Sequence, residues 1–155
     1  MDPFRVIAIP DEIADAARQT RRSPVYRHPV HAEVATGYGP CRLWLREFVI
    51  GAERRLLLTY DCFSGKEHLP LPGPIFIHES SCERYAEDDG LPAGVRRHPV
   101  TLNAYARGRR LLAQEYVRDG VVEPVVAHLL ARPDVDYIHV RDTDAGCFDF
   151  AIERC

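Results

Sequence analysis

The 155-residue sequence lacks several patterns by which a protein's function is usually recognised. It has no Cys-x-x-Cys pair, so neither a zinc ribbon nor a thioredoxin-like redox motif is present. It also has no phosphate-binding glycine loop, no Gly-x-Ser-x-Gly turn and no His-Glu-x-x-His helix. These absences argue against the common nucleotide-binding, serine-hydrolase and metalloprotease classes.

The chain also has no long apolar run and no strong excess of one charge. No apolar segment reaches transmembrane length, and the run near the N-terminus is too short for a secretory signal. We therefore expect a cytoplasmic protein that does not enter the membrane. The 20 basic and 23 acidic residues give a net charge of −3, which predicts no general affinity for nucleic acid. The five cysteines are odd in number and widely spaced, which favours reduced thiols.

A hydrophobic content of 46% is enough for one domain, and we expect that domain to span residues 1–155. Apolar periodicity predicts a mostly antiparallel α+β fold, built from hairpins with its helices on one side of the sheet. The predicted helices cover residues 11–20 and about 120–132, the second capped by Asp119, with a further helical turn near 82–85. The predicted strands cover 4–9, 41–46 paired with 54–60, 74–78, 101–106 paired with 111–117, and 135–141 paired with 147–153.

The last predicted hairpin separates its side chains clearly between two faces. A three-residue loop at 143–145 would place Val140 opposite Phe148 and Ile138 opposite Phe150, all on the apolar face. A five-residue loop would shift these partners but keep the faces. Either register leaves the odd-numbered side chains together on the other face.

That other face carries His139, Arg141, Cys147 and Asp149, which together resemble a nucleophile–base arrangement. A neighbouring guanidinium lowers a thiol pKa, and a carboxylate opposite an imidazole fixes its tautomer. We therefore predict a catalytic set with Cys147 as the thiol, His139 as the base and Asp149 as its partner. The alternative is a solvated sheet face of mixed charge, in which a small cysteine fills space.

Two further segments carry candidate ligands. His78 and Cys82 would lie one helical turn apart if their segment is helical, and Cys41 or Cys147 would complete a zinc site with them. The alternative is a strand-end histidine followed by a polar loop. The planar guanidinium of Arg42 is suited to a carboxylate or phosphate, unless it is an exposed strand arginine.

Three short motifs resemble the bacterial family known as domain of unknown function 1203 (DUF1203). They are GPCR at 39–42, GPIFIHE at 73–79 followed by Cys82, and YIHV at 137–140 followed by GCF at 146–148 and Arg154. The resemblance implies a small, single-domain, cytosolic bacterial protein and implies no activity. It draws attention to six positions: Cys41, Arg42, His78, Cys82, His139 and Cys147. Family members often carry a histidine and an asparagine where this chain has Arg141 and Asp142, so the resemblance supports His139 and Cys147 over Arg141.

These observations lead to one main hypothesis and two alternatives. The main hypothesis is a Cys/His-containing pocket that binds or acts on a small polar or anionic ligand by thiol chemistry. Its expected ligand-binding residues are Arg42, Cys41, His78, Cys82 and Arg141. The first alternative is a non-catalytic binding or dimerising module with structural cysteines, and the second is a small zinc-binding domain. A small molecule and a second copy of the chain are the partners considered; no cofactor is evident from the sequence, and zinc enters only with the second alternative.

Overall fold

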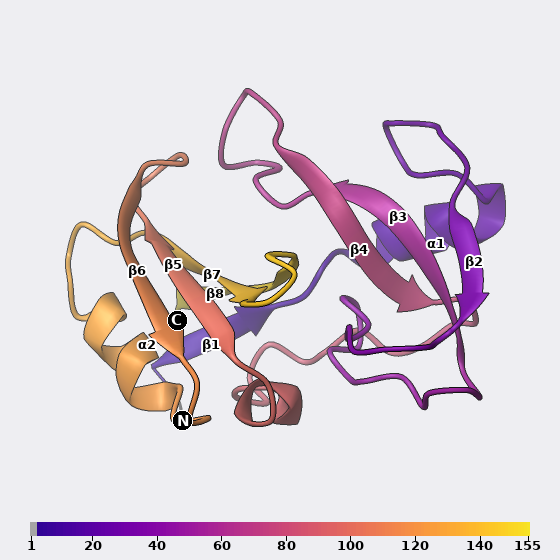
Figure 1. Ribbon diagram of the computed structural model, residues 1–155. Coiled ribbons are helices and arrows are strands. Elements are labelled where there is room, and N and C mark those ends of the chain that lie inside the picture. Colours follow the sequence, from indigo (N-terminus) through magenta and orange to yellow (C-terminus); the bar gives the residue numbers. More distant parts are fainter. Residues whose placement is uncertain (1–2) are drawn as a thin grey trace.

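The strands form two antiparallel sheets in the computed structural model, which describes residues 3–155 (Figure 1). The five-stranded sheet has the order β1 (Phe4–Ile7), β8 (Phe148–Arg154), β7 (Tyr137–Asp142), β5 (Val100–Tyr105) and β6 (Leu111–Val117). The three-stranded sheet has the order β2 (His31–Val34), β3 (Arg54–Asp61) and β4 (Pro72–His78). The predicted α+β class is confirmed, but the strands divide between two sheets instead of forming one.

The two α-helices are both short. Helix α1 (Asp11–Thr20) has the predicted bounds and follows Pro10, whose fixed φ suits a helix start. Helix α2 (Glu123–Leu130) begins later and ends earlier than predicted. The Asp119 carboxylate accepts the N–H of Val121 ahead of the helix, so it does not cap it as predicted. Within residues 3–155, neither helix has the length and apolar content that a bilayer-spanning segment needs.

Residues 41–46 form a turn and not the predicted strand. Leu45 N–H donates to Cys41 O at 2.7 Å, and Cys41 N–H donates to Arg46 O at 2.9 Å. The φ of Leu45 is +56°, which is incompatible with extended backbone. Strand β3 therefore pairs with β4 and with β2, a strand that was not predicted. The segment 82–85 is irregular, and the short helix of that loop is a 3-10 turn at Ala93–Arg96.

The last hairpin does not have the register of a three-residue loop: its pairs from Ile138 to Val140 are those of the five-residue loop, and a β-bulge then shifts the register at Arg141. The observed partners are Ile138 with Ile152, His139 with Ala151, Val140 with Phe150 and Arg141 with Phe148. Asp149 is the extra residue on β8, and bulges of this kind re-aim the neighbouring side chains. Phe148 therefore leaves the predicted apolar face and packs edge-on against His139, with ring centroids 4.9 Å apart.

Each sheet is covered by one helix and has its own apolar cluster. Val126 and Leu129 of α2 pack with Ile138 and Val140 of the five-stranded sheet. The second cluster joins Ala14 and Ala17 of α1 to Leu56 and Ile77 of the three-stranded sheet, and it includes Cys41. Strands β4 and β8 contact each other where the two sheets meet.

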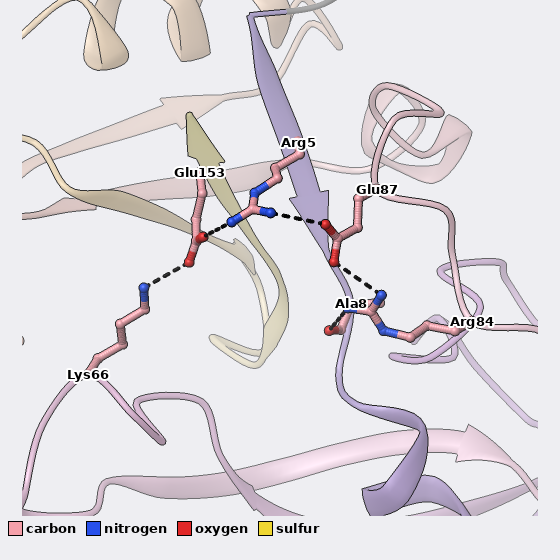
Figure 2. Close-up of polar contacts among 6 residues, drawn as sticks. All are labelled: Arg5, Ala8, Lys66, Arg84, Glu87 and Glu153. Atoms are coloured by element: carbon pink, nitrogen blue, oxygen red, sulfur yellow. Dashed lines mark hydrogen bonds and ion pairs between the residues drawn. The ribbon is translucent and has the colours of Figure 1, made fainter. Parts of the chain in front are cut away.

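A chain of ion pairs adds a polar connection between the sheets (Figure 2). Lys66, from the loop after β3, lies 2.8 Å from Glu153 of β8, which also lies 3.0 Å from Arg5 of β1. Arg5 and Arg84 both pair with Glu87, at 3.4 Å and 3.3 Å. Lys66, Arg5 and Arg84, the three cations of this row of ion pairs, therefore each have a carboxylate partner.

Candidate functional site

Cys41 is fixed between the 41–46 turn and strand β4. Arg42 N–H donates to Phe76 O at 2.9 Å, which attaches the turn to β4 two residues before the strand ends. The Cys41 side chain is fully buried, and its Sγ accepts the backbone N–H of His78 at 3.4 Å. Gly39 permits this close approach, because a Cβ at that position would lie 2.8 Å from the Phe76 ring. The backbone thus places a sulfur acceptor beside the last residue of β4.

His78 is the last residue of β4, and its side chain is only 5% exposed. Its ring packs against Phe48 at 4.4 Å and Trp44 at 5.4 Å between centroids. Nε2 lies 3.4 Å from Oε2 of Glu53. Neither ring nitrogen meets hydrogen-bond geometry with a partner in the described part of the chain. Because buried polar atoms normally have partners, these two nitrogens indicate a missing one.

Cys82 completes the cluster from the loop after β4. Its Sγ lies 3.8 Å from Cys41 Sγ, and the ligand atoms of Cys41, His78 and Cys82 all lie within 4.8 Å of one another. Arg18 of α1 holds this loop, donating from Nε to His78 O at 3.1 Å and from Nη2 to Cys82 Sγ at 3.4 Å. A cation beside a sulfur favours its thiolate form.

The electrostatics of the cluster favour one negative charge on the pair of cysteine sulfurs, with the second cysteine protonated. Burial raises the pKa of Cys41, but the Cys82 thiol and the nearby His78, whose backbone N–H donates to Cys41 Sγ, outweigh burial and lower that pKa overall. The hydrogen bond to Cys41, together with burial, raises the pKa of Cys82 well above its ordinary value. Burial lowers the pKa of His78, yet the Cys41 and Glu53 side chains raise it overall. Cys41 is therefore the thiolate of the pair.

Arg42 and Asp149 form a buried ion pair. Arg42 Nη2 lies 2.8 Å from Asp149 Oδ1, and each side chain is 3% exposed. The guanidinium also donates from Nε to Phe148 O at 2.8 Å and from Nη1 to Pro40 O at 2.6 Å. Burial raises the pKa of Asp149 to about 6, although Arg42 lowers it. The pair attaches the turn that carries Cys41 to strand β8.

His139 lies among aromatic rings, in a recess that Cys62 also lines. It is 1% exposed, and its ring contacts Phe63, Tyr105, Tyr137 and Phe148 at centroid distances of 4.8, 5.3, 5.0 and 4.9 Å. Burial lowers the pKa of His139 to about 3, helped by Arg141 and Lys66. The imidazole is therefore neutral at physiological pH.

Cys147 lies in a third environment, at the end of the β7–β8 turn. It lines a pocket together with Arg141 and Cys62. Burial raises the pKa of Cys147, although Arg42 lowers it. Within residues 3–155, no hydrogen bond or ion pair joins any two of the proposed catalytic residues Cys147, His139 and Asp149. The structure instead brings together Cys41, His78 and Cys82.

Two residues of the cluster environment were not predicted from the sequence. Arg18 lies in the last turn of α1, and its distance of 64 positions from Cys82 gives no local signal. Glu53 precedes β3, opposite the end of β4, and it reaches His78 only because β3 and β4 pair. Both contacts depend on the tertiary fold and not on a motif.

Fold and site together define an antiparallel α+β protein with a buried Cys–His–Cys cluster between a turn, a strand end and a loop. The family model described as "Protein of unknown function (DUF1203)" matches residues 38–154, which include all three cluster residues. The chain belongs to that family, as its three motifs predicted. No curated protein and no solved structure matches it.

Proposed function

We propose that Cys41, His78 and Cys82 bind one Zn²⁺ ion, and that this protein functions through that metal centre. The spacing of the two sulfurs is the observation that carries the proposal. Zn–S bonds of about 2.3 Å at a tetrahedral angle place two sulfurs about 3.8 Å apart. Cys41 Sγ and Cys82 Sγ are 3.8 Å apart, whereas a disulfide requires about 2.05 Å.

The unpartnered histidine supports the same assignment. A metal ion bound at Nδ1 of His78 would satisfy one orphaned nitrogen, and Nε2 would then donate its proton to Glu53. Metal-bound histidines are commonly oriented by a carboxylate in this way. Two thiolates neutralise the charge of the ion, and Arg18 beside Cys82 further favours the thiolate form.

Three protein ligands leave one coordination position for water or a small solute. Structural zinc sites use four protein ligands, whereas catalytic sites keep one position open. Among residues 3–155, no fourth His, Cys, Asp or Glu joins the cluster. A surface recess of about 470 Å³ reaches His78 and is also lined by Glu53, Arg54 and Glu79. We therefore favour a centre that binds or activates a small polar ligand, in a reducing cytoplasm that keeps both cysteines from forming a disulfide.

Zinc stoichiometry in matched variants tests this proposal. Wild-type protein dialysed against chelator-buffered Zn²⁺ should retain about one ion per chain by elemental analysis. Cys41→Ser, His78→Ala and Cys82→Ser should each lower the zinc affinity by about tenfold or more. Cys147→Ser is the control, because its sulfur lines another pocket, and it should bind zinc like the wild type.

Two outcomes would contradict the proposal. One is wild-type protein that retains no zinc under these conditions. The other is a cluster variant, folded by circular dichroism, that binds zinc as tightly as the wild type does.

A further inference from the structure

A small pocket lies where the two sheets meet, away from the proposed zinc centre. The turn that joins β7 to β8 extends toward the three-stranded sheet (Figure 1). Between this turn and the start of β4 is a cavity of about 170 Å³, with apolar walls from Tyr60, Pro72, Ile75 and Phe148. None of these wall residues carries a charge.

Arg141 is the one charged side chain among the residues that line this pocket. It donates from Nη1 to Gly146 O at 3.1 Å and from Nη2 to Cys62 Sγ at 3.4 Å. Both acceptors are uncharged, because burial raises the pKa of the Cys62 thiol. Over residues 3–155, no carboxylate lies within ion-pair distance of Arg141, in contrast to Arg5 and Arg42.

Cys147 adds a polarisable and neutral wall to the pocket. Burial raises the pKa of its thiol, so it carries no negative charge at pH 7 that would oppose an anion. Its side chain is partly exposed at the pocket. The pocket therefore combines an apolar interior with one guanidinium that has no carboxylate within ion-pair distance, while Asp142 and Asp149 lie close enough to raise the pKa of Cys147.

We propose that this pocket binds a small monocarboxylate with a short apolar chain, whose carboxylate pairs with the guanidinium of Arg141. A guanidinium binds a carboxylate through two parallel N–H donors, and the apolar walls favour a hydrocarbon tail over a fully hydrated anion such as phosphate. The size also fits, because a cavity of about 150 Å³ holds a molecule with the six heavy atoms of benzene. Butyrate has the same number of heavy atoms.

A titration with sodium butyrate, followed by the amide signals of the protein in NMR, tests this site. Saturable shifts are expected at Gly146, Cys147 and Phe148, which line the pocket. Arg141→Gln should weaken this binding by about tenfold or more, because a hydrogen-bonded charge is lost. Arg118→Gln makes the same chemical change at an exposed arginine and should bind butyrate like the wild type.

A second measurement needs no variant. Butyrate should slow the alkylation of Cys147 by iodoacetamide in wild-type protein, measured by peptide mass spectrometry, and neutral butyramide should not. Equal protection by butyramide, equal binding by Arg141→Gln, tighter binding of inorganic phosphate than of butyrate, or no saturable shift would each overturn the proposal.

Discussion

Replacement of Arg42 by methionine tests how the turn that carries Cys41 is held in place. Arg42 lies 2.8 Å from Asp149, and both side chains are 3% exposed, so water does not replace the lost cation. Removal of one partner from a buried ion pair costs about 3–5 kcal/mol. A domain of this size has a free energy of unfolding of about 5–15 kcal/mol, so the variant should unfold at a much lower urea concentration.

The loss of folding stability in Arg42→Met should increase as the pH rises. Burial already raises the pKa of Asp149 to about 6 from an ordinary value of 3.8, and loss of Arg42, which lowers that pKa, raises it further. A carboxyl whose folded-state pKa is raised stabilises the fold most below its unfolded pKa, and this stability is lost as the pH rises. The free energies of unfolding of wild type and variant should therefore differ least near pH 5, where both proteins keep Asp149 protonated. They should differ most above pH 7.

Urea unfolding monitored by the fluorescence of Trp44, the only tryptophan, measures both effects. The double variant Arg42→Met/Asp149→Leu is the control, because well-packed apolar residues often replace a buried ion pair at a net cost near zero. It should recover most of the lost stability at pH 7. A loss below about 1 kcal/mol in the single variant, or a loss that does not change between pH 5 and pH 8, would refute the reasoning.

Three further predictions concern the site and its surroundings. His139→Phe should change the free energy of unfolding by less than about 1.5 kcal/mol in urea, because the neutral ring is packed among aromatic rings; a loss above 3 kcal/mol would contradict this. Gly39→Ala should destabilise the fold by about 1–3 kcal/mol in the same assay, since φ is +147° and Phe76 blocks the added Cβ. Zinc at about 100 times its dissociation constant should stabilise wild-type protein by about 2.7 kcal/mol in thermal unfolding and should not stabilise Cys82→Ser.

Apolar periodicity was sufficient to predict most of the fold. The alternation in 101–106 and 111–117 and the helical stripe after Asp119 correspond to β5, β6 and α2. The same signal was misleading at 41–46, where alternating side chains are buried in a turn. Cys41, Leu43 and Leu45 are buried there because the turn packs on other parts of the chain, and not because the segment is a strand.

The register of the last hairpin required tertiary information. Side-chain parity assumes an uninterrupted ladder, and the bulge at Asp149 breaks that assumption. The buried contact between Asp149 and Arg42 accompanies the bulge, and a partner 107 positions away leaves no trace in the local pattern. This is why Phe148, which parity placed on the apolar face, packs against His139 in the structure.

The cluster of Cys41, His78 and Cys82 was only partly accessible from the sequence. The His-x-x-x-Cys spacing identified two of its members, although the helix assumed for that spacing is absent from 78–82. Cys41 was one of two open choices for the third ligand. Only the attachment of its turn to β4 shows that Cys41, and not Cys147, lies beside them.

X-ray absorption at the zinc edge of the loaded protein tests the central claim most directly. The proposed centre predicts two sulfur neighbours at about 2.3 Å, together with nitrogen or oxygen neighbours at about 2.0–2.1 Å. Cys82→Ser should lose one sulfur neighbour, and Cys147→Ser should keep both. A spectrum with only nitrogen and oxygen neighbours, or one in which Cys147→Ser loses a sulfur, would contradict a zinc centre formed by Cys41, His78 and Cys82.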